Sequence, residues 1–450
     1  MKYLLLLSAL IITSTVEANL HLAPPDFQTD NGHAIFVDFK TAHYDITYDL
    51  KKRVTRVKTR ITFNAERSGT PVFDLIPEPK NILLNGTPVS QRSISFPGGL
   101  STVRQLDQDV SPGEHVLEME NTFKKHTQYI PLLRYVASAF WIRDLQDRKF
   151  LEQYIPSNFE YDQYKMTMDV KFIGNRHAQE IYTNGALTKI NKDHYQIEYP
   201  EYFTSSCLYF HTTPKGWMKR LDFSYKSISG REIPMTVYSP WKLRTKKFKT
   251  KVLKVIAELE NDYGPWAHPG LLAYGTFPGT GGMEHAGATA TSLAALDHEM
   301  LHSYFAKGVM PANGNSGWID EAIAAWRDRG YPRSADPGFS GSNLGAHSVY
   351  QRHTDDRAYV LGSAFMSYID YRLQDMGGLK AFLKGYFQAY KHTVVTTEHF
   401  KNNLEFFARI DLSADFEKYI WGKNPQDVEE ILKENPVHGK LTETQLNSLL

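Results

Sequence analysis

The sequence predicts two domains: an N-terminal all-β domain, built as a saddle or sandwich, and a second α+β domain that is mainly helical. Three observations predict this organisation. The chain has 450 residues, which is too long for one ordinary hydrophobic core. From residue 37 to about 210, apolar residues recur with the period of strands, and beyond about 220 most recur with the period of helices. We therefore place the domains at 19–220 and 221–436, with 437–450 as a peripheral tail.

The first 18 residues have the pattern of a secretory signal peptide. Met1-Lys2 is followed by an apolar run at 3–12, and Val16-Glu17-Ala18 fits the small-x-small cleavage pattern. We expect cleavage after Ala18 and export to a bacterial periplasm or to the outside of the cell. Cys207 is the single cysteine, so the exported chain has no internal disulfide.

The composition narrows the class of protein. Apolar residues make up 42% and charged residues 22% of the chain, and the formal net charge is +1. This balance is typical of a globular protein and gives no reason to expect a nucleic acid partner. After the signal peptide, no run reaches the roughly 18 apolar residues of a transmembrane helix. Nothing in the sequence indicates the oligomeric state.

The expected strands and helices follow from hydrophobic periodicity. Within 46–50 and 57–63, apolar residues alternate with polar ones, and turn-forming clusters follow at 67–71 and 85–88. The second domain opens with a few strands and then becomes helical. The helices are expected at 246–262, 291–306, 319–329, 357–373, 379–390 and 396–408.

The most informative motif is His298-Glu299-Met300-Leu301-His302 within the helix expected at 291–306. Thr291 or Ser292 is its expected N-cap and Gly308 its stop. Histidines at positions i and i+4 leave one face of a helix about one turn apart, so both can bind one metal ion. The alternative is a surface helix with two solvated histidines.

A third ligand is expected from Glu321, nineteen positions after His302. A turn-rich link at 311–317 leads into the helix expected at 319–329, and helix, loop and helix bring Glu321 back over the histidines. Three protein ligands with an open fourth position are typical of catalytic zinc. The sequence thus predicts a zinc hydrolase.

Four segments resemble the gluzincin aminopeptidases, the family of aminopeptidase N and leukotriene hydrolase, in which a β saddle precedes a thermolysin-like catalytic domain. The second segment is closest to the motif of the related glycyl aminopeptidases. The segments are His298 to His302 with Glu321, Gly281-Gly282-Met283-Glu284-His285, Tyr359-Val360-Leu361-Gly362, and Asp411-Leu412-Ser413 with Phe416 and Gly422.

The resemblance implies a zinc metalloaminopeptidase with one zinc ion per chain, acting on peptide or protein N-termini. Glu299 is then the general base and Tyr359 the donor to the oxyanion, while Glu284 binds the substrate's α-ammonium group. The other residues of its motif are expected to contact substrate: Gly281, Gly282, Met283 and His285.

Departures from the family leave alternatives open. Glu284 lies only fourteen residues before His298, His285 replaces an asparagine, and Leu361 replaces a lysine. Other possible oxyanion donors are Tyr350, Tyr368, Tyr371, His347 and His353. Asp320 either supports a ligand histidine or is simply acidic in a first helical turn. The alternative functions are a thermolysin-like zinc endopeptidase and a catalytically silent zinc-fold binding protein.

Overall fold

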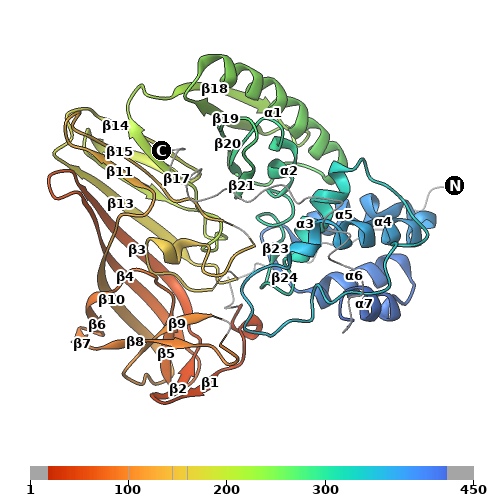
Figure 1. The fold of residues 1–450 in the computed structure, drawn as a ribbon, viewed down its shortest axis with the longest axis horizontal. Helices are drawn as coiled ribbons and strands as arrows, with labels where there is room; N and C mark the ends of the chain where they lie inside the picture. The colour runs from red at the N-terminus through yellow and green to blue at the C-terminus, as the bar shows by residue number, and fades with distance from the viewer. Residues whose placement is uncertain (1–18, 100, 144, 160, 423–450) are drawn as a thin grey trace.

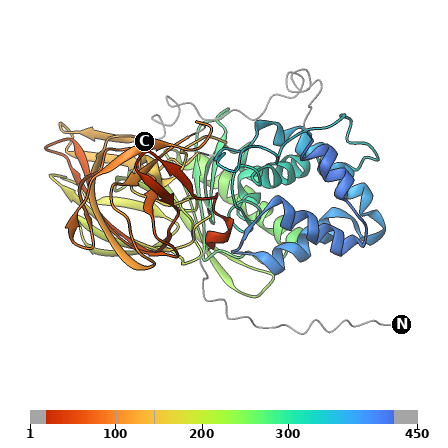
Figure 2. The same ribbon diagram turned by 90° about the horizontal axis from the view of Figure 1, so that it is seen from below.

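The computed structural model of the protein describes residues 19–99, 101–143, 145–159 and 161–422. The predicted signal peptide at 1–18 and the predicted tail at 437–450 lie outside the described residues. Figures 1 and 2 show two halves side by side, one made of strands and one that contains the long helices. The prediction that a sheet-rich N-terminal part precedes a part with helices is confirmed.

Three sheets build the N-terminal half. Their strand orders are β15-β16-β13-β3-β4-β10-β6-β7, β1-β2-β5-β9-β8 and β11-β12-β17-β14. The bounds are β1 (Phe27–Thr29), β2 (Gly32–Ile35), β3 (Asp38–Asp49), β4 (Val54–Ala65), β5 (Thr70–Phe73), β6 (Lys80–Leu84), β7 (Thr87–Pro88), β8 (Gln91–Ser95), β9 (Thr102–Leu106), β10 (Gly113–Phe123), β11 (Thr127–Ile130), β12 (Tyr135–Ala139), β13 (Lys165–Ile173), β14 (Gln179–Thr183), β15 (Ala186–Asn191), β16 (His194–Glu198) and β17 (Phe210–Pro214). Two 3₁₀ helices accompany them, η1 (Asn19–Leu22) and η2 (Leu151–Gln153).

Alternation of apolar and polar residues explains how these strands pack. On β4, Val57, Ile61 and Phe63 are buried, and the intervening Lys58 and Arg60 are exposed, because successive side chains of a strand point to opposite faces. β3 pairs with β4 antiparallel and with β13 parallel. The predicted alternation within 46–50 and 57–63 is therefore confirmed.

The second half is an α+β unit. Its sheet has the order β18-β19-β20-β22-β21, and α1 packs against β18, β19 and β20. The bounds are β18 (Lys219–Lys226), β19 (Glu232–Ser239), α1 (Lys242–Tyr263), β20 (Leu271–Gly275), β21 (Gly282–His285), β22 (Ala288–Thr291), α2 (Leu296–Leu301), β23 (Met310–Pro311), α3 (Trp318–Asp328), η3 (Asp356–Tyr359), α4 (Leu361–Arg372), η4 (Gln374–Met376), α5 (Gly378–Tyr390), β24 (Val394–Val395), α6 (Thr397–Ala408) and α7 (Ser413–Tyr419). As predicted, this half opens with strands and continues mainly with helices, although β21 and β22 interrupt the segment before α2. Among the described residues, no helix is long and apolar enough to cross a membrane.

The helix predicted at 291–306 is shorter than expected. Ala288–Thr291 forms β22, which pairs with β20 and β21, so Thr291 belongs to the sheet and is not an N-cap. The N-cap position of α2 is Ala295, while Ser292 lies in the preceding turn and its hydroxyl accepts a bond from Ala295 N–H. Beyond Leu301 the chain continues in turns rather than as a helix up to Gly308.

Aromatic side chains join the two halves. Tyr182 stacks on Tyr238 with ring centroids 3.7 Å apart, and Trp141 stacks on Tyr274 at 6.1 Å. These residues belong to one buried cluster that draws on the four-stranded sheet of the first half and on the five-stranded sheet of the second. The edge strand β21 consequently lies close to the junction between the halves.

Candidate metal centre and active site

α2 carries three of the predicted site residues, His298, Glu299 and His302. Leu296 and Leu301 of the same helix are buried in the core of the second half, which fixes the rotation of the helix about its axis. The histidines lie one turn apart, with ring centroids 4.8 Å apart. His302 is the C-cap residue of α2, and its backbone N–H still donates to the carbonyl of His298.

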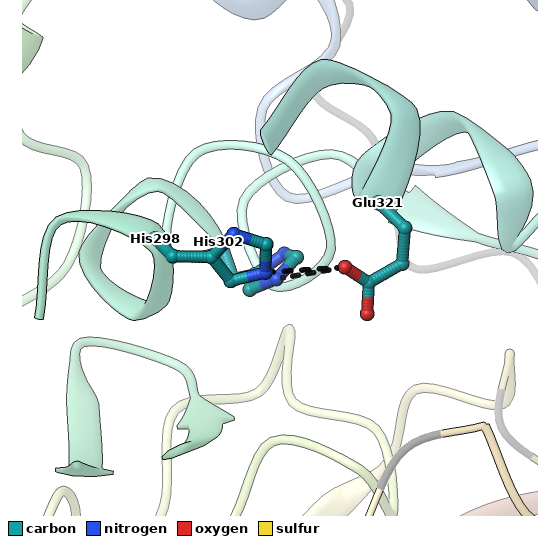
Figure 3. Close-up of side chains that lie close together, drawn as sticks. All are labelled: His298, His302 and Glu321. Atoms are coloured by element: carbon teal, nitrogen blue, oxygen red, sulfur yellow. Dashed lines mark hydrogen bonds and ion pairs between the residues drawn. The ribbon is translucent and has the colours of Figure 1, made fainter. Parts of the chain in front are cut away.

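Glu321, from the first turn of α3, faces the two imidazoles (Figure 3). Its Oε2 atom lies 3.2 Å from His298 Nε2 and 3.5 Å from His302 Nε2. One ligand atom from each of the three buried residues lies within 4.8 Å of the others, and no second such group of His, Cys, Asp or Glu occurs in the described ranges. Two imidazoles and one carboxylate are the donor set of a catalytic zinc site with an open position.

Hydrogen bonds to the Nδ1 atoms orient both imidazoles. His298 Nδ1–H donates to Asp328 Oδ2 at 2.7 Å, and His302 Nδ1–H donates to the carbonyl of Phe305 at 3.2 Å. The Nε2 atoms are therefore left to face Glu321, the tautomer that metal binding through Nε2 requires. Asp320 Oδ2 lies 3.8 Å from His302 Nδ1, beyond hydrogen-bond length.

Asp328 was not predicted as a site residue. It lies seven residues after Glu321, so both fall on one face of α3. An acidic residue two turns beyond the predicted ligand was the signal that could have identified it. Lys307, which also contacts the site, had no comparable signal in the sequence.

Charges in the site shift one another's proton affinity. Burial lowers the pKa of His298, but the hydrogen bonds to Asp328 and Glu321 outweigh it and raise the pKa to about 10. Burial also lowers the pKa of His302, and Glu321 raises it well above its usual value. The pKa of Glu321 is lowered despite its burial, because both histidines favour its charged form.

Glu299 lies against the backbone of β21. A Cβ atom placed on Gly282 would come within 2.3 Å of the Glu299 carboxyl carbon, so the carboxylate occupies the space that any side chain at position 282 would need. Burial raises the pKa of Glu299 to about 8, and the nearby Glu284 and Glu321 act in the same direction against the two histidines. Glu299 is thus a buried carboxylate between the candidate ligands and the sheet edge.

Glu284 projects from the same edge strand and is buried. Its Oε1 atom lies 3.4 Å from Lys307 Nζ, and both side chains are at least nine-tenths buried. Glu284 also raises the pKa of Glu299 and of His302 through its charge. The structure therefore brings Glu284 into the electrostatic environment of the candidate metal ligands.

Two residues predicted to contact substrate point away from the site. Successive residues of a strand alternate between faces, so Met283 and His285 face opposite to Glu284. Met283 packs in the cluster that joins the two halves. His285 Nδ1–H donates to the carbonyl of Leu208, and burial lowers the pKa of His285 to about 3. The side chains of Met283 and His285 thus face away from the candidate ligands, and their contact with a substrate stays a prediction.

Gly281 precedes the edge strand. Its carbonyl accepts a bond from Ser292 N–H at 3.4 Å, which ties the start of β21 to the turn before α2. Gly281 and Gly282 therefore lie at the edge of the sheet. There β21 pairs with β22 on one side and with no described strand on the other.

Tyr359 lies beside the candidate ligands. Its hydroxyl donates to Glu321 Oε1 at 2.7 Å, and its ring stacks at 6.0 Å from that of His298. The close packing of α4 on α3 sets this position, because a Cβ atom on Gly362 would come within 2.8 Å of Ala322 Cβ. Tyr359 is thus held against the oxygen of Glu321 that does not face the histidines.

The other predicted oxyanion donors are either bonded elsewhere or exposed. The Tyr350 hydroxyl donates to the Pro25 carbonyl, and that of Tyr368 donates to Asp415. Tyr371 and His353 are exposed, and His347 Nε2 lies 3.0 Å from Asp355. Of the predicted donors, all in the described part of the chain, Tyr359 is the one whose hydroxyl contacts a candidate ligand carboxylate.

We compared the chain with protein families, curated sequences and solved structures. No protein-family model and no curated protein sequence matches the chain. Leukotriene A4 hydrolase from Saccharomyces cerevisiae superposes with a TM-score of 0.65 at 13% identity, covering 87% of this chain and 69% of that one. An M1 zinc metallopeptidase from Deinococcus radiodurans gives 0.61 at 15% identity, covering 87% and 96%. A mutant of the latter bound to a Tyr-Ser-Ala substrate gives 0.62 at 14%, covering 86% and 95%. At these identities the comparisons establish a shared fold.

Proposed function

We propose that the chain is an exported zinc aminopeptidase of the gluzincin aminopeptidase family, which removes residues from the N-termini of peptides or proteins. The observation that carries the proposal is the grouping of His298, His302 and Glu321 with Glu299 and Glu284 in one buried site. The motif resemblance and the fold shared with M1 zinc metallopeptidases support it. Export rests on the signal-peptide pattern of residues 1–18.

One zinc ion per chain fits the donor set. The three ligands are buried, and their second nitrogen or oxygen atoms are already engaged by Asp328, by the Phe305 carbonyl and by Tyr359. When bound, zinc is a Lewis acid that polarises the substrate carbonyl and lowers the pKa of water from about 15.7 to about 7.

Glu299 is the general base of the proposed reaction. It accepts a proton from the attacking water, whose oxygen adds to the scissile carbonyl carbon, and it delivers that proton to the leaving amine as the C–N bond breaks. Its carboxylate is buried beside the candidate ligands, where it is positioned to transfer a proton. Tyr359, beside Glu321, is the proposed donor to the developing oxyanion.

Glu284 gives the proposed exopeptidase specificity. The substrate adds to the edge strand β21 through backbone hydrogen bonds, with its α-ammonium group against the Glu284 carboxylate. The open edge at Gly281 and Gly282 allows a second backbone to approach closely. A buried carboxylate stabilises a charged N-terminus at this position and rejects an acylated one.

Endopeptidase activity is the second candidate, and one contact favours it. The Glu284 carboxylate lies 3.4 Å from the Lys307 ammonium, so an internal cation already neutralises the proposed amine anchor. If that pair persists with substrate bound, the cleft does not select a free N-terminus.

The test uses a free-amine peptide and its N-acetylated counterpart, with and without a chelator, and reads the products by mass spectrometry. We expect stepwise loss of N-terminal residues from the free peptide alone, abolished by the chelator. Internal cleavage of both peptides would identify an endopeptidase. Zinc binding with no hydrolysis of a broad peptide library would identify a silent binding protein.

Variants at Glu284 sharpen the same test. Glu284→Gln keeps the shape of the side chain and removes its charge, so the preference for the free peptide should fall by about 100-fold or more through loss of a buried charge pair. Glu232→Gln, at an exposed position of β19, is the matched control and should leave the preference unchanged.

A further inference from the structure

Five loops meet at one end of the N-terminal half, and the last of them leads from β17 into β18. We call this surface the basic end; its loops are 50–53, 124–126, 131–134, 174–178 and 215–217. Leu50 N–H donates to the Ile173 carbonyl at 3.0 Å, which joins the first loop to the fourth. Because Thr55 pairs with Phe123 across β4 and β10, the second loop lies next to the first.

The remaining loops are tied together in the same way. Arg176 N–H donates to the carbonyl of Arg134, and Lys215 N–H donates to that of Ala178, each at 2.9 Å. The ring of Trp217 lies 4.4 Å from that of Tyr135, which directly follows the third loop. The five loops therefore form one continuous surface.

The basic end carries positive charge without matching negative charge. Its loops contain no Asp or Glu, and their eight Lys and Arg side chains are all exposed: Lys51, Lys52, Arg53, Lys124, Lys125, Arg134, Arg176 and Lys215. None of the eight forms an ion pair with any residue in the described part of the chain.

The acidic residues that border this surface are bonded to other cations. Asp49 pairs with Arg56, Asp193 with Lys192, and Glu180 with Arg220. Their charge is therefore partly compensated by residues outside the eight; of the eight, Lys52 also lowers the pKa of Asp49 through its charge.

Large apolar side chains project between these cations. Leu132 is 92% exposed, Leu133 is 53% exposed and Trp217 is 47% exposed. Two adjacent leucines at the tip of the β11–β12 hairpin cost free energy in water, since each leaves apolar area unburied. Exposed apolar groups gathered in one place mark an interaction site.

We infer that the basic end docks the protein on a membrane surface rich in anionic phospholipid. Leu132, Leu133 and Trp217 enter the interface between headgroups and acyl chains, where tryptophan is favoured. The eight cations then lie at the level of the phosphate groups and are attracted by the negative surface potential.

An acidic polymer would engage the cations but would not need the leucines. The apolar tip therefore favours a lipid surface over an acidic protein or nucleic acid. The candidate metal centre lies in the other half of the molecule, on α2 and α3 (Figure 1). The inference does not depend on the proposed function.

The test is flotation of the purified protein with phosphatidylcholine vesicles, with and without phosphatidylglycerol. We expect binding only when phosphatidylglycerol is present, and weaker binding at high salt because exposed charges are screened. The double variant Leu132→Ser with Leu133→Ser should lower the partition coefficient about tenfold or more, through loss of apolar area buried in the interface. Arg134→Glu with Arg176→Glu should do the same.

Phe406→Ser is the matched control, since Phe406 is 86% exposed but lies on α6; it should bind as the unaltered protein does. Circular dichroism melting verifies that every variant is folded. Absence of binding to anionic vesicles, or equal binding by the leucine variant, overturns the inference. If the protein binds heparin but not vesicles, and the leucine variant still binds heparin, the partner is an acidic polymer and not a lipid surface.

Discussion

Glu299 can lie against the backbone of β21 because residue 282 has no side chain. In Gly282→Ala, the added methyl group would meet the Glu299 carboxylate, 2.3 Å from its carboxyl carbon. The flexible carboxylate should move and the strand should stay, so we expect kcat/KM for peptide hydrolysis to fall about 100-fold, as for a displaced catalytic group. Steady-state kinetics on a free-amine peptide measures the effect.

Two further measurements separate this displacement from unfolding. Zinc content and the melting temperature of Gly282→Ala should match those of the unaltered protein. Gly385→Ala, whose new methyl group meets nothing within 4 Å, should keep full activity. Loss of zinc in Gly282→Ala would contradict the account.

Asp328 fixes the ring of a candidate metal ligand through its 2.7 Å bond with His298 Nδ1. Asp328→Asn keeps the shape but removes the charge that favours this tautomer, so zinc affinity should fall about 10- to 100-fold. Competition with a chromophoric chelator measures the dissociation constant. Asp375→Asn, at an exposed position of η4, should not change it, and an unchanged affinity in Asp328→Asn would show that the Nδ1 contact is dispensable.

A single residue could be placed from the sequence where its spacing from other site residues matched a helical or a strand period. His298, His302 and Glu321 could be placed together because the helical period relates the histidines and a turn-rich link returns the carboxylate. Met283 and His285 were assigned by motif alone, although the strand period of two places them opposite Glu284. Lys307 could not be predicted, because its contact with Glu284 depends on the turns that follow α2.

Close packing of α4 on α3 sets the position of Tyr359. In Gly362→Ala, the new methyl group would lie 2.8 Å from Ala322 Cβ, and two helix backbones cannot yield as a side chain can. We expect the free energy of unfolding to fall by about 1–3 kcal/mol, as for an overpacked core, and the activity to fall with it. Urea denaturation measures the first change.

The matched helical control is again Gly385→Ala, which should raise the free energy of unfolding by about 0.5–1 kcal/mol because glycine disfavours a helix interior. If Gly362→Ala is as stable as this control, the glycine does not determine the α3–α4 distance.

Elements were predicted well where one period covered the whole segment, and less well where the chain changed structure within a few residues. The expectation for 319–329 agrees with α3 (Trp318–Asp328) to within a residue. The expectation for 291–306 merged β22, a turn and α2, because Ala, Thr and Leu are compatible with a helix and the pairing of Ala288–Thr291 with distant strands is not visible locally.

In the molecule as a whole, the charges of the candidate site make the free energy of unfolding depend on pH and on bound metal. In chelator-treated protein, His298 has a pKa raised to about 10 and Glu299 one raised to about 8. A raised folded-state pKa contributes stability at low pH that is lost as the pH rises through the folded value. For His298 this contribution is complete below about 6.5 and disappears toward pH 10; Glu321, whose pKa is lowered, titrates only in acid.

Zinc binding changes the sign of this dependence. The metal needs neutral imidazoles, so binding near neutral pH releases protons and strengthens as the pH rises. We expect the melting temperature of the chelated protein to fall between pH 6.5 and 9. Its free energy of unfolding should fall by about 1.4 kcal/mol per pH unit for each proton that the folded state binds and the unfolded state does not. The stabilisation by added zinc should grow over the same range. Calorimetry at several pH values, with zinc and with chelator, measures both quantities; a zinc-dependent stabilisation that is independent of pH would mean that the histidines carry no protons in the metal-free protein.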